Sequence, residues 1–249
     1  MRDWRVLVPR PAGGELSRLL SGRGAIPVEI PLIAIRPPTD DGALDAAARA
    51  IDGYDWIVVT SVNGVRAVFD RLRALGIAYP ERPRWVAVGP ATAAAVAAEG
   101  MRVARVPESG TGAAIAGELG DLDGQRVLLP RARIASDDLP EALGARGARV
   151  DAVAAYDTVI GPESSREPLA RALDAGLHAA IFTSGSTVAG FVHLAGDPRA
   201  RLAEAVTVCI GPTTARVLEE AGVRPSRVAA RRTPEALVQA LEEVAHARA

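Results

Sequence analysis

The sequence repeats itself. Three short motifs occur twice, in the same order, at offsets of 121 to 123 residues. The pairs are Val6-Leu-Val-Pro-Arg-Pro with Val127-Leu-Leu-Pro-Arg-Ala, Val59-Thr-Ser-Val-Asn-Gly-Val with Phe182-Thr-Ser-Gly-Ser-Thr-Val, and Val88-Gly-Pro-Ala-Thr-Ala with Ile210-Gly-Pro-Thr-Thr-Ala. Self-similarity at one fixed period is typical of an architecture built from repeated units. We therefore expect the 249-residue chain to be an internal duplication.

Short apolar, β-branched runs alternate with alanine- and arginine-rich stretches of helical character along the chain. This alternation is typical of an α/β protein with parallel sheets. The expected strands are residues 5–9, 28–35, 56–60, 85–88, 103–106, 126–129, 149–156, 179–183, 207–210 and 228–230. The expected helices are residues 15–21, 44–51, 64–75, 91–99, 112–119, 139–146, 166–175, 187–194, 213–220 and 234–246. Strand cores such as Trp56-Ile-Val-Val are apolar at every position, which predicts helices on both faces of each sheet.

Two strand-like segments are longer than a small domain needs. Residues 26–36 and 149–160 hold equivalent places in the two repeats, and Pro37-Pro38 and Gly161-Pro162 follow them directly. We expect both segments to run from one domain into the other as a paired connection. The domains would then not coincide with the two halves of the sequence.

The charge balance and the rare residue types exclude several function classes. The 29 basic residues nearly match the 30 acidic residues, which argues against a nucleic-acid partner. All 29 Lys and Arg residues are arginines, which excludes Schiff-base and pyridoxal-phosphate enzymes that need a lysine, and P-loop nucleoside triphosphatases. Cys209 is the only cysteine and the three histidines are scattered, so we expect no metal site. A charged N-terminus and the absence of a long apolar run predict a cytoplasmic protein without a membrane partner.

Four of the expected strands end in Gly, Pro, Ser or Thr immediately before a helix. The candidate binding residues in these turns are Thr60, Ser61, Gly89, Thr92, Thr183, Ser184, Ser186, Gly211, Thr213 and Thr214. Ligands of open α/β sheets bind beyond the carboxyl ends of the strands, where helix N-termini attract anions. The alternative is that these hydroxyl groups only cap their helices, as serine and threonine do in many proteins. The sequence leaves both interpretations open.

Two arginines and one tyrosine complete the candidate set. Arg10 and Arg131 directly follow equivalent strands of the two repeats, where a guanidinium group could bind a carboxylate through two hydrogen bonds. A solvated loop arginine is the alternative for each of them. Tyr156 lies near the end of the second long strand, where its phenol could donate a proton or hydrogen bond. The alternative is an aromatic side chain that only packs against the sheet.

Taken together, these motifs resemble the uroporphyrinogen-III synthase family. The resemblance spans nearly the whole chain and also includes Pro31-Leu-Ile-Ala-Ile, Ala155-Tyr-Asp-Thr and Ile181-Phe-Thr-Ser. It implies two flavodoxin-like domains, one formed by residues 1–35 and 160–249 and the other by residues 36–159. A two-stranded β connector at about residues 30–37 and 152–161 would join them. The resemblance also implies a monomer.

The same resemblance implies an enzyme, a lyase of tetrapyrrole biosynthesis that needs no cofactor. Its substrate would be hydroxymethylbilane, a linear tetrapyrrole polycarboxylate, cyclised to uroporphyrinogen III with loss of water and inversion of ring D. Tyr156 matches the family tyrosine proposed to help the hydroxyl group leave, and the Gly-Pro-Thr-Thr turn at Thr213 and Thr214 matches a family turn. Ala91 in the first repeat stands opposite Thr213 in the second, so the two repeats differ chemically. The alternative is a non-catalytic, two-domain intracellular ligand-sensing module.

Overall fold

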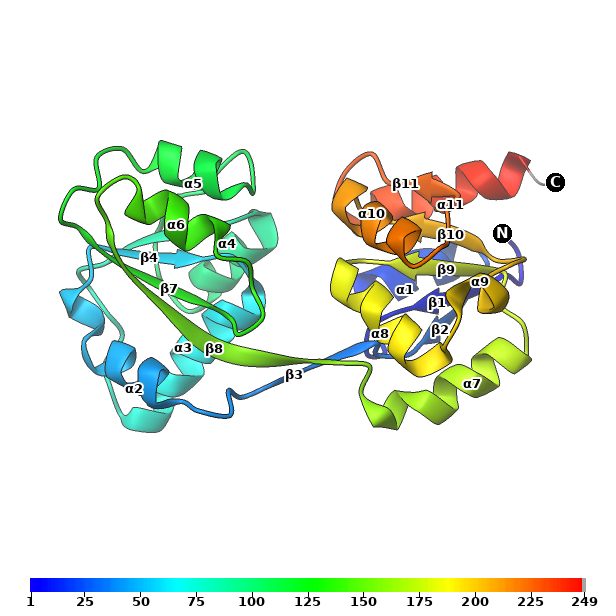
Figure 1. Ribbon diagram of the computed structural model, residues 1–249, viewed down its shortest axis with the longest axis horizontal. Helices are drawn as coiled ribbons and strands as arrows, with labels where there is room; N and C mark the ends of the chain where they lie inside the picture. The colour runs from blue at the N-terminus through cyan, green and yellow to red at the C-terminus, as the bar shows by residue number, and fades with distance from the viewer. Residues whose placement is uncertain (248–249) are drawn as a thin grey trace. The chain divides into compact units, whose positions relative to one another are not determined.

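The chain forms two compact units (Figure 1). The structure is a computed structural model that describes residues 1–247. Unit 1 consists of Met1–Ala34 together with the chain from Val159 onward, and unit 2 consists of Ile35–Thr158. Each unit is built around a sheet whose registered strand pairs are parallel. The prediction of an α/β protein with parallel sheets is confirmed.

Unit 1 holds a five-stranded sheet in the order β11-β10-β9-β1-β2. Its strands are β1 (Arg5–Val8), β2 (Ile26–Glu29), β9 (Ala179–Phe182), β10 (Val206–Cys209) and β11 (Arg227–Val228). Its helices are α1 (Glu15–Gly22), α7 (Arg166–Asp174), α8 (Gly185–Ala195), α9 (Pro198–Arg201), α10 (Pro212–Glu220) and α11 (Pro234–Ala247). All four neighbouring strand pairs are parallel.

Both faces of the unit 1 sheet are buried, because successive side chains of a strand point to opposite faces. Val6 and Val8 of β1 belong to a core cluster with residues of α1 and α11. Leu7, between them, belongs to a second cluster with residues of α7, α8 and α10. All three side chains are at most 1% exposed. The apolar strand cores thus predicted helices on both faces correctly.

Unit 2 holds a six-stranded sheet in the order β3-β8-β7-β4-β5-β6. Its strands are β3 (Ile33–Arg36), β4 (Trp56–Val59), β5 (Arg84–Ala87), β6 (Val103–Arg105), β7 (Arg126–Ala132) and β8 (Arg149–Ile160). Its helices are α2 (Gly42–Arg49), α3 (Val62–Leu75), α4 (Pro90–Ala98), α5 (Gly112–Glu118) and α6 (Asp138–Gly144). Ile57 and Val59 pack with α2, α3 and α4, whereas Trp56 and Val58 pack with α5 and α6.

The segment predicted as one strand over residues 28–35 is two strands. β2 ends at Glu29 and β3 begins at Ile33, with Pro31 in the interruption. Proline has no backbone N–H to donate to a neighbouring strand. Beyond it, the Leu32 carbonyl accepts a hydrogen bond from Gly161 N–H at 2.9 Å. The second long segment is one uninterrupted strand of 12 residues, β8, and the chain passes between the units within β3 and within β8.

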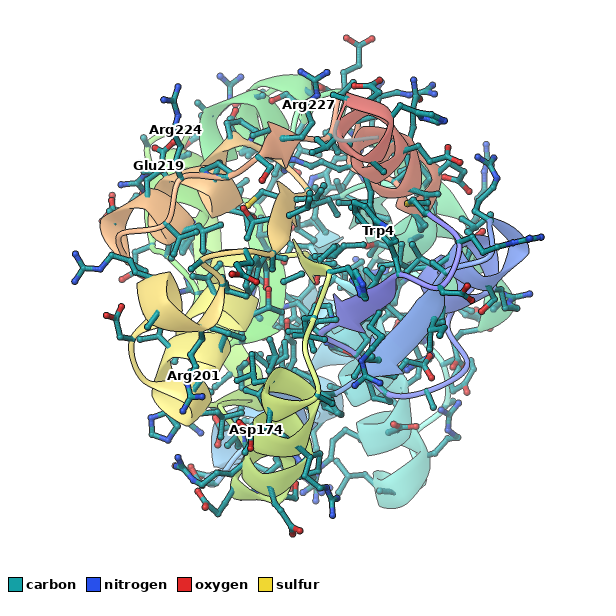
Figure 2. All side chains as sticks on the ribbon, turned by 90° about the vertical axis from the view of Figure 1, so that its right-hand side faces the viewer. Trp4, Asp174, Arg201, Glu219, Arg224 and Arg227 are labelled. Atoms are coloured by element: carbon teal, nitrogen blue, oxygen red, sulfur yellow. The ribbon has the colours of Figure 1, made fainter. Side chains whose placement is uncertain are left out.

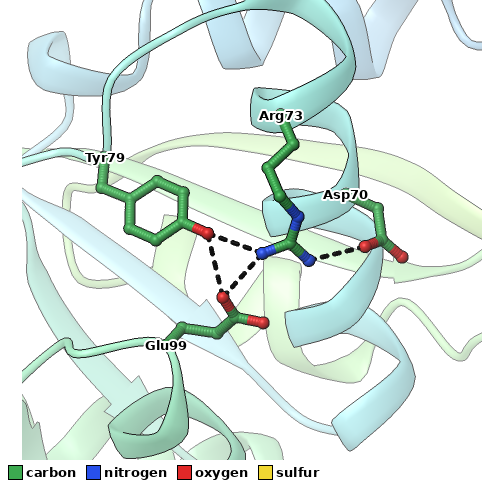
Figure 3. Close-up of polar contacts among 4 residues, drawn as sticks. All are labelled: Asp70, Arg73, Tyr79 and Glu99. Carbon is green, nitrogen blue, oxygen red and sulfur yellow. Dashed lines mark hydrogen bonds and ion pairs between the residues drawn. The ribbon is translucent and has the colours of Figure 1, made fainter.

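Polar side chains form hydrogen bonds and ion pairs between helices in each unit. In unit 2, Arg73 of α3 donates to Tyr79 Oη at 2.6 Å and to Glu99 Oε2 at 2.8 Å (Figure 3). Tyr79 also donates to Glu99 at 3.0 Å, which joins the end of α4 to α3. In unit 1, the side chains of Arg201 and Asp174 form an exposed ion pair at 3.9 Å, and both are labelled in Figure 2.

Within residues 1–247, no helix combines the length and apolar character that crossing a membrane requires.

Candidate functional site

The unit 2 candidates lie in or after neighbouring parallel strands, near one edge of the sheet. β4, β7 and β8 are adjacent, and β5 pairs with β4 on its other side. Parallel strands all end at one edge of their sheet. The structure therefore brings five predicted positions to this edge, and they are Thr60, Ser61, Gly89, Arg131 and Tyr156. Thr92 belongs to the same set, on the first turn of α4.

Tyr156 and Ser61 form a polar pair at this edge. Their hydroxyl oxygens share a hydrogen bond at 2.9 Å, and Tyr156 is 9% exposed. Ser61 is the N-cap of α3, where its Oγ accepts a hydrogen bond from Gly64 N–H at 3.1 Å. The Ser61 hydroxyl hydrogen remains available to the phenol, because the cap uses only an oxygen lone pair. Ser61 therefore caps a helix and also orients the Tyr156 phenol.

Gly64 allows α3 to start this close to the sheet. A Cβ at residue 64 would lie 3.0 Å from the Pro130 carbonyl oxygen of β7, tighter than ordinary contact. The glycine thus lets the first turn of α3 approach the strand that lies beside β8. This close approach supports the placement of the Ser61 hydroxyl next to Tyr156.

A hollow of about 410 Å³ lies beside Tyr156, within unit 2. Residues of β3, α2, α3 and β8 line it, among them Arg36, Asn63 and Arg66. None of these three is among the candidates predicted from the sequence. One usable signal existed, since Asn63 directly follows the predicted Thr60-Ser61 turn and Arg66 lies one helical turn further along α3. Arg36 gave no signal, because its place depends on how β3 meets α2 and α3.

The prediction that Arg131 directly follows a strand is wrong. Arg131 lies inside β7, where its backbone pairs in register with Ala154 of β8. Its guanidinium group donates to the Ala135 carbonyl and lies 3.0 Å from Asp137 Oδ1. Only 11% of the side chain is exposed. Arg131 therefore holds the loop that follows β7, and this correction has a simple cause: the long partner strand β8 extends the pairing past Pro130.

Asp157, next to Tyr156, carries a perturbed carboxyl group. Arg133 donates to its Oδ1 at 2.7 Å, and the backbone N–H of Thr39 donates to its Oδ2 at 2.9 Å. These hydrogen bonds stabilise the carboxylate and hold the pKa of Asp157 below its usual value of 3.8, with Arg133 the larger cause. The contact with Thr39 links the segment after β3 to β8, at the residue next to Tyr156.

The unit 1 candidates also lie along one edge. β10, β9 and β1 are adjacent and parallel, so the residues that follow them share the carboxyl-terminal edge of the sheet. The predicted positions at this edge are Arg10, Thr183, Ser184, Ser186, Gly211, Thr213 and Thr214. The structure thus groups the candidates into two sets, one in each unit.

Some of these hydroxyl groups cap the helix that follows them. Ser184 Oγ accepts from Thr187 N–H, and Thr187 Oγ1 accepts from Ser184 N–H, both at 3.2 Å. This reciprocal pair is a capping box at the start of α8. Ser184 Oγ also lies 2.8 Å from Ser186 Oγ. The capping interpretation is therefore realised at Ser184, as at Ser61, and it does not preclude a ligand at the same turn.

The equivalent Gly-Pro turns differ between the units. Gly89 has φ of 91°, a left-handed conformation that favours glycine, whereas Gly211 is extended with φ of −177°. Thr92 and Thr214, the third residues of α4 and α10, are each 4% exposed and pack inward. Thr213 is exposed. Among the described residues, no cluster of three or more His, Cys, Asp or Glu side chains could hold a metal ion.

Comparisons with known proteins agree with these features. The family model for uroporphyrinogen-III synthase HemD matches residues 14–239. The chain is 30% identical over 248 residues to the uroporphyrinogen-III synthase of Synechococcus elongatus, covering 96% of this chain and 94% of that protein. It is 32% identical over 246 residues to the porphyrin biosynthesis protein HemD of Ruminiclostridium josui, covering 96% of this chain but 48% of that longer protein.

Solved structures share the fold. A mutant uroporphyrinogen III synthase from Thermus thermophilus has a TM-score of 0.69 at 24% identity, covering 98% of this chain and 99% of that one. The Helicobacter pylori uroporphyrinogen-III synthetase has a TM-score of 0.63 at 21% identity, covering 98% of this chain and 100% of that one. Because the family model covers most of the chain and the Synechococcus elongatus relative matches it nearly end to end, the chain belongs to the uroporphyrinogen-III synthase family, a family of enzymes of tetrapyrrole biosynthesis.

Proposed function

We propose that this chain cyclises hydroxymethylbilane to uroporphyrinogen III, with Tyr156 as its catalytic residue. Beside family membership, one observation carries the proposal: a hydroxyl-paired phenol lies on the wall of a hollow large enough for part of a substrate. The hollow also presents arginines, which suit a polycarboxylate. The relatives are named for synthesis rather than sensing, so the ligand-sensing alternative is not favoured.

The chemistry asks little of the protein. The carbon–oxygen bond to the terminal hydroxyl group breaks, and a proton is needed for the oxygen to leave as water. The Tyr156 phenol would donate it, and the Ser61 hydroxyl would then donate a hydrogen bond to the phenolate oxygen. The resulting electrophilic carbon bonds to the substituted ring D carbon and gives a spiro intermediate. The original bond between that ring D carbon and its methylene bridge then breaks, and the freed methylene carbon bonds to the unsubstituted α-carbon of ring D, which closes the inverted macrocycle. Loss of the proton on that α-carbon restores the pyrrole and would return a proton to the Tyr156 oxygen. Most of the acceleration would come from holding the bilane in this folded arrangement.

The turns of each unit would bind the carboxylates. The proposed donors are the backbone N–H groups of the turns, the hydroxyl groups there that are not buried, and Arg10 and Arg131. The turn residues are Thr60, Ser61, Gly89, Thr92, Thr183, Ser184, Ser186, Gly211, Thr213 and Thr214. Helix N-termini attract anions through their free N–H groups, without requiring a basic chain. This is compatible with a net charge of −1. We also propose a monomer in the cytoplasm, with no nucleic-acid or membrane partner.

The finer architecture belongs to the same proposal. Residues 1–35 with 160–249, and residues 36–159, would be two flavodoxin-like domains from one duplication, joined by connector strands at about 30–37 and 152–161. Unit 1 supports this because its strands, numbered along the chain, lie in the flavodoxin-like order 2-1-3-4-5. Unit 2 has the same order when counting begins at β7 and continues through β8, β4, β5 and β6. The pairing of β3 with β8 supports the connector.

Product analysis tests the proposed function. The purified chain is supplied with hydroxymethylbilane, the products are oxidised, and the type I and type III isomers are resolved by chromatography. Spontaneous closure gives the type I isomer, so an excess of type III over a protein-free control is expected. Type I alone would overturn the proposed function and leave the ligand-sensing alternative.

A further inference from the structure

Three arginines line the hollow beside Tyr156. Arg36 ends β3, and Arg66 and Arg71 lie on α3. Apolar residues, Ile35 and Leu44 among them, also line the hollow. Ile35 is 41% exposed, so its apolar surface is accessible in the same hollow as the cationic groups.

Arg71 is held by acidic partners within unit 2. Its Nη2 lies 2.9 Å from Asp41 Oδ2, and its Nε donates to Asp45 Oδ1. The hydrogen bond from Arg71 lowers the pKa of the Asp45 carboxyl group. The remaining acidic residue of the hollow, Asp70, pairs with Arg73 at 2.7 Å (Figure 3). The two carboxylates that line the hollow, those of Asp41 and Asp70, therefore each already have a cationic partner.

Arg36 and Arg66 differ from Arg71 in this respect. Both are exposed, and neither has an acidic partner among residues 1–247. An arginine without a partner presents its N–H groups as a fork that matches the two oxygens of a carboxylate. The apolar residues that line the same hollow suit the hydrocarbon part of the same ligand. This combination fits an organic acid with carboxylate-tipped side chains on an apolar body.

We propose that Arg36 and Arg66 bind carboxylate side chains of the substrate and position it against Tyr156. The inference rests on the proposed function for the identity of the substrate, but the arginine site can be tested without turnover. The two arginines come from different elements, β3 and α3, so a ligand that contacts both would be fixed in orientation as well as bound. In the cyclisation, they would act on substrate binding rather than on proton transfer.

The test compares Arg36→Gln, Arg66→Gln and the double variant with the wild-type chain. Arg105→Gln is the matched control, because Arg105 is an exposed arginine of unit 2 that does not line the hollow. One readout is KM and kcat for hydroxymethylbilane. The second is the equilibrium Kd for uroporphyrin, a stable porphyrin polycarboxylate that is not turned over, measured at low and high salt.

Each single variant should raise KM and the uroporphyrin Kd about fivefold, the scale of one exposed ionic contact. The double variant should raise both about 25-fold, because separate contacts add in free energy. Arg66→Lys should recover part of the loss because it keeps the charge without the fork. High salt should reduce the differences in Kd between the arginine variants and the wild type. Arg105→Gln should have the KM and Kd of the wild type.

The two proposals fail in different ways. Type III product with unchanged KM and Kd in both arginine variants overturns the arginine site and leaves the synthase function standing. A wild-type chain that forms only type I, but binds uroporphyrin through Arg36 and Arg66, overturns the function and supports the site. An equal increase of KM and Kd in Arg105→Gln would also overturn the site. Binding would then depend on the net charge of the chain and not on the two arginines of the hollow.

Discussion

The replacement Gly190→Ala tests how closely α8 packs in unit 1. A Cβ at residue 190 would lie 1.9 Å from the Leu32 carbonyl oxygen, a separation that no real side chain shows. Overpacking of this kind costs about 3 kcal/mol, the upper end of its usual range, because the obstacle is backbone. Displacing the carbonyl would weaken its hydrogen bond from Gly161 N–H, about 1 kcal/mol. Alanine returns about 1 kcal/mol of helix propensity. The expected net loss is about 3 kcal/mol.

The single cysteine reports this loss directly. Cys209 is fully buried in the core cluster that also contains Leu32 and Phe191. Burial raises the pKa of its thiol to about 12, so the folded chain should resist thiol reagents at pH 8. Reaction then requires opening of unit 1. A loss of about 3 kcal/mol should speed labelling about 150-fold, at roughly tenfold per 1.4 kcal/mol.

The matched control is Gly117→Ala in α5. A Cβ there would meet nothing within 4 Å, so alanine should stabilise the chain by about 0.5–1 kcal/mol in urea unfolding. Gly190→Ala should thus lower the free energy of unfolding, whereas Gly117→Ala should raise it. Wild-type labelling and urea midpoints in Gly190→Ala would refute the close approach of α8 to Leu32.

Two further predictions concern unit 2. The lowered pKa of Asp157 means that its contribution to stability is complete above pH 3.8 and is lost as the pH falls through the lowered value. A carbon-13 NMR titration of its carboxyl group should find that midpoint, and Arg133→Gln should raise it. An unchanged midpoint in the variant would contradict the role of Arg133. Tyr79→Phe removes the hydroxyl that hydrogen-bonds both Arg73 and Glu99, and it should lower the free energy of unfolding in urea by about 1 kcal/mol. Full wild-type stability would show that this hydroxyl group contributes nothing.

Much of the fold could be predicted from local pattern alone. Apolar runs such as Trp56-Ile-Val-Val identified strands buried on both faces, and Gly or hydroxyl residues after them identified helix starts. The division of residues 26–36 into two strands was missed. Pro31 offered a signal, but proline is also found at strand edges, and only the contact between Leu32 and Gly161 shows that the ladder breaks there.

The candidate site was only partly predictable, for physical reasons. Tyr156 and Ser61 were both expected, but their hydrogen bond depends on the register between β8, β7 and β4, which no local pattern contains. Arg131 was expected at a strand end, and the length of β8 placed it within the strand instead. Arg66 looks like any surface arginine in sequence; the packing of α2 and α3 makes it part of a hollow.

The most direct test of the account is the isomer ratio from hydroxymethylbilane for Tyr156→Phe, with Tyr79→Phe as the matched loss of a phenol outside the hollow. A positioned general acid contributes about 100-fold or more, so loss of the proposed proton donor should slow the enzymatic step about 100-fold. Tyr156→Phe should therefore form type III more slowly and with a larger share of spontaneous type I, without losing activity completely. Tyr79→Phe should give the wild-type ratio. A wild-type rate and ratio in Tyr156→Phe would contradict the role assigned to this tyrosine.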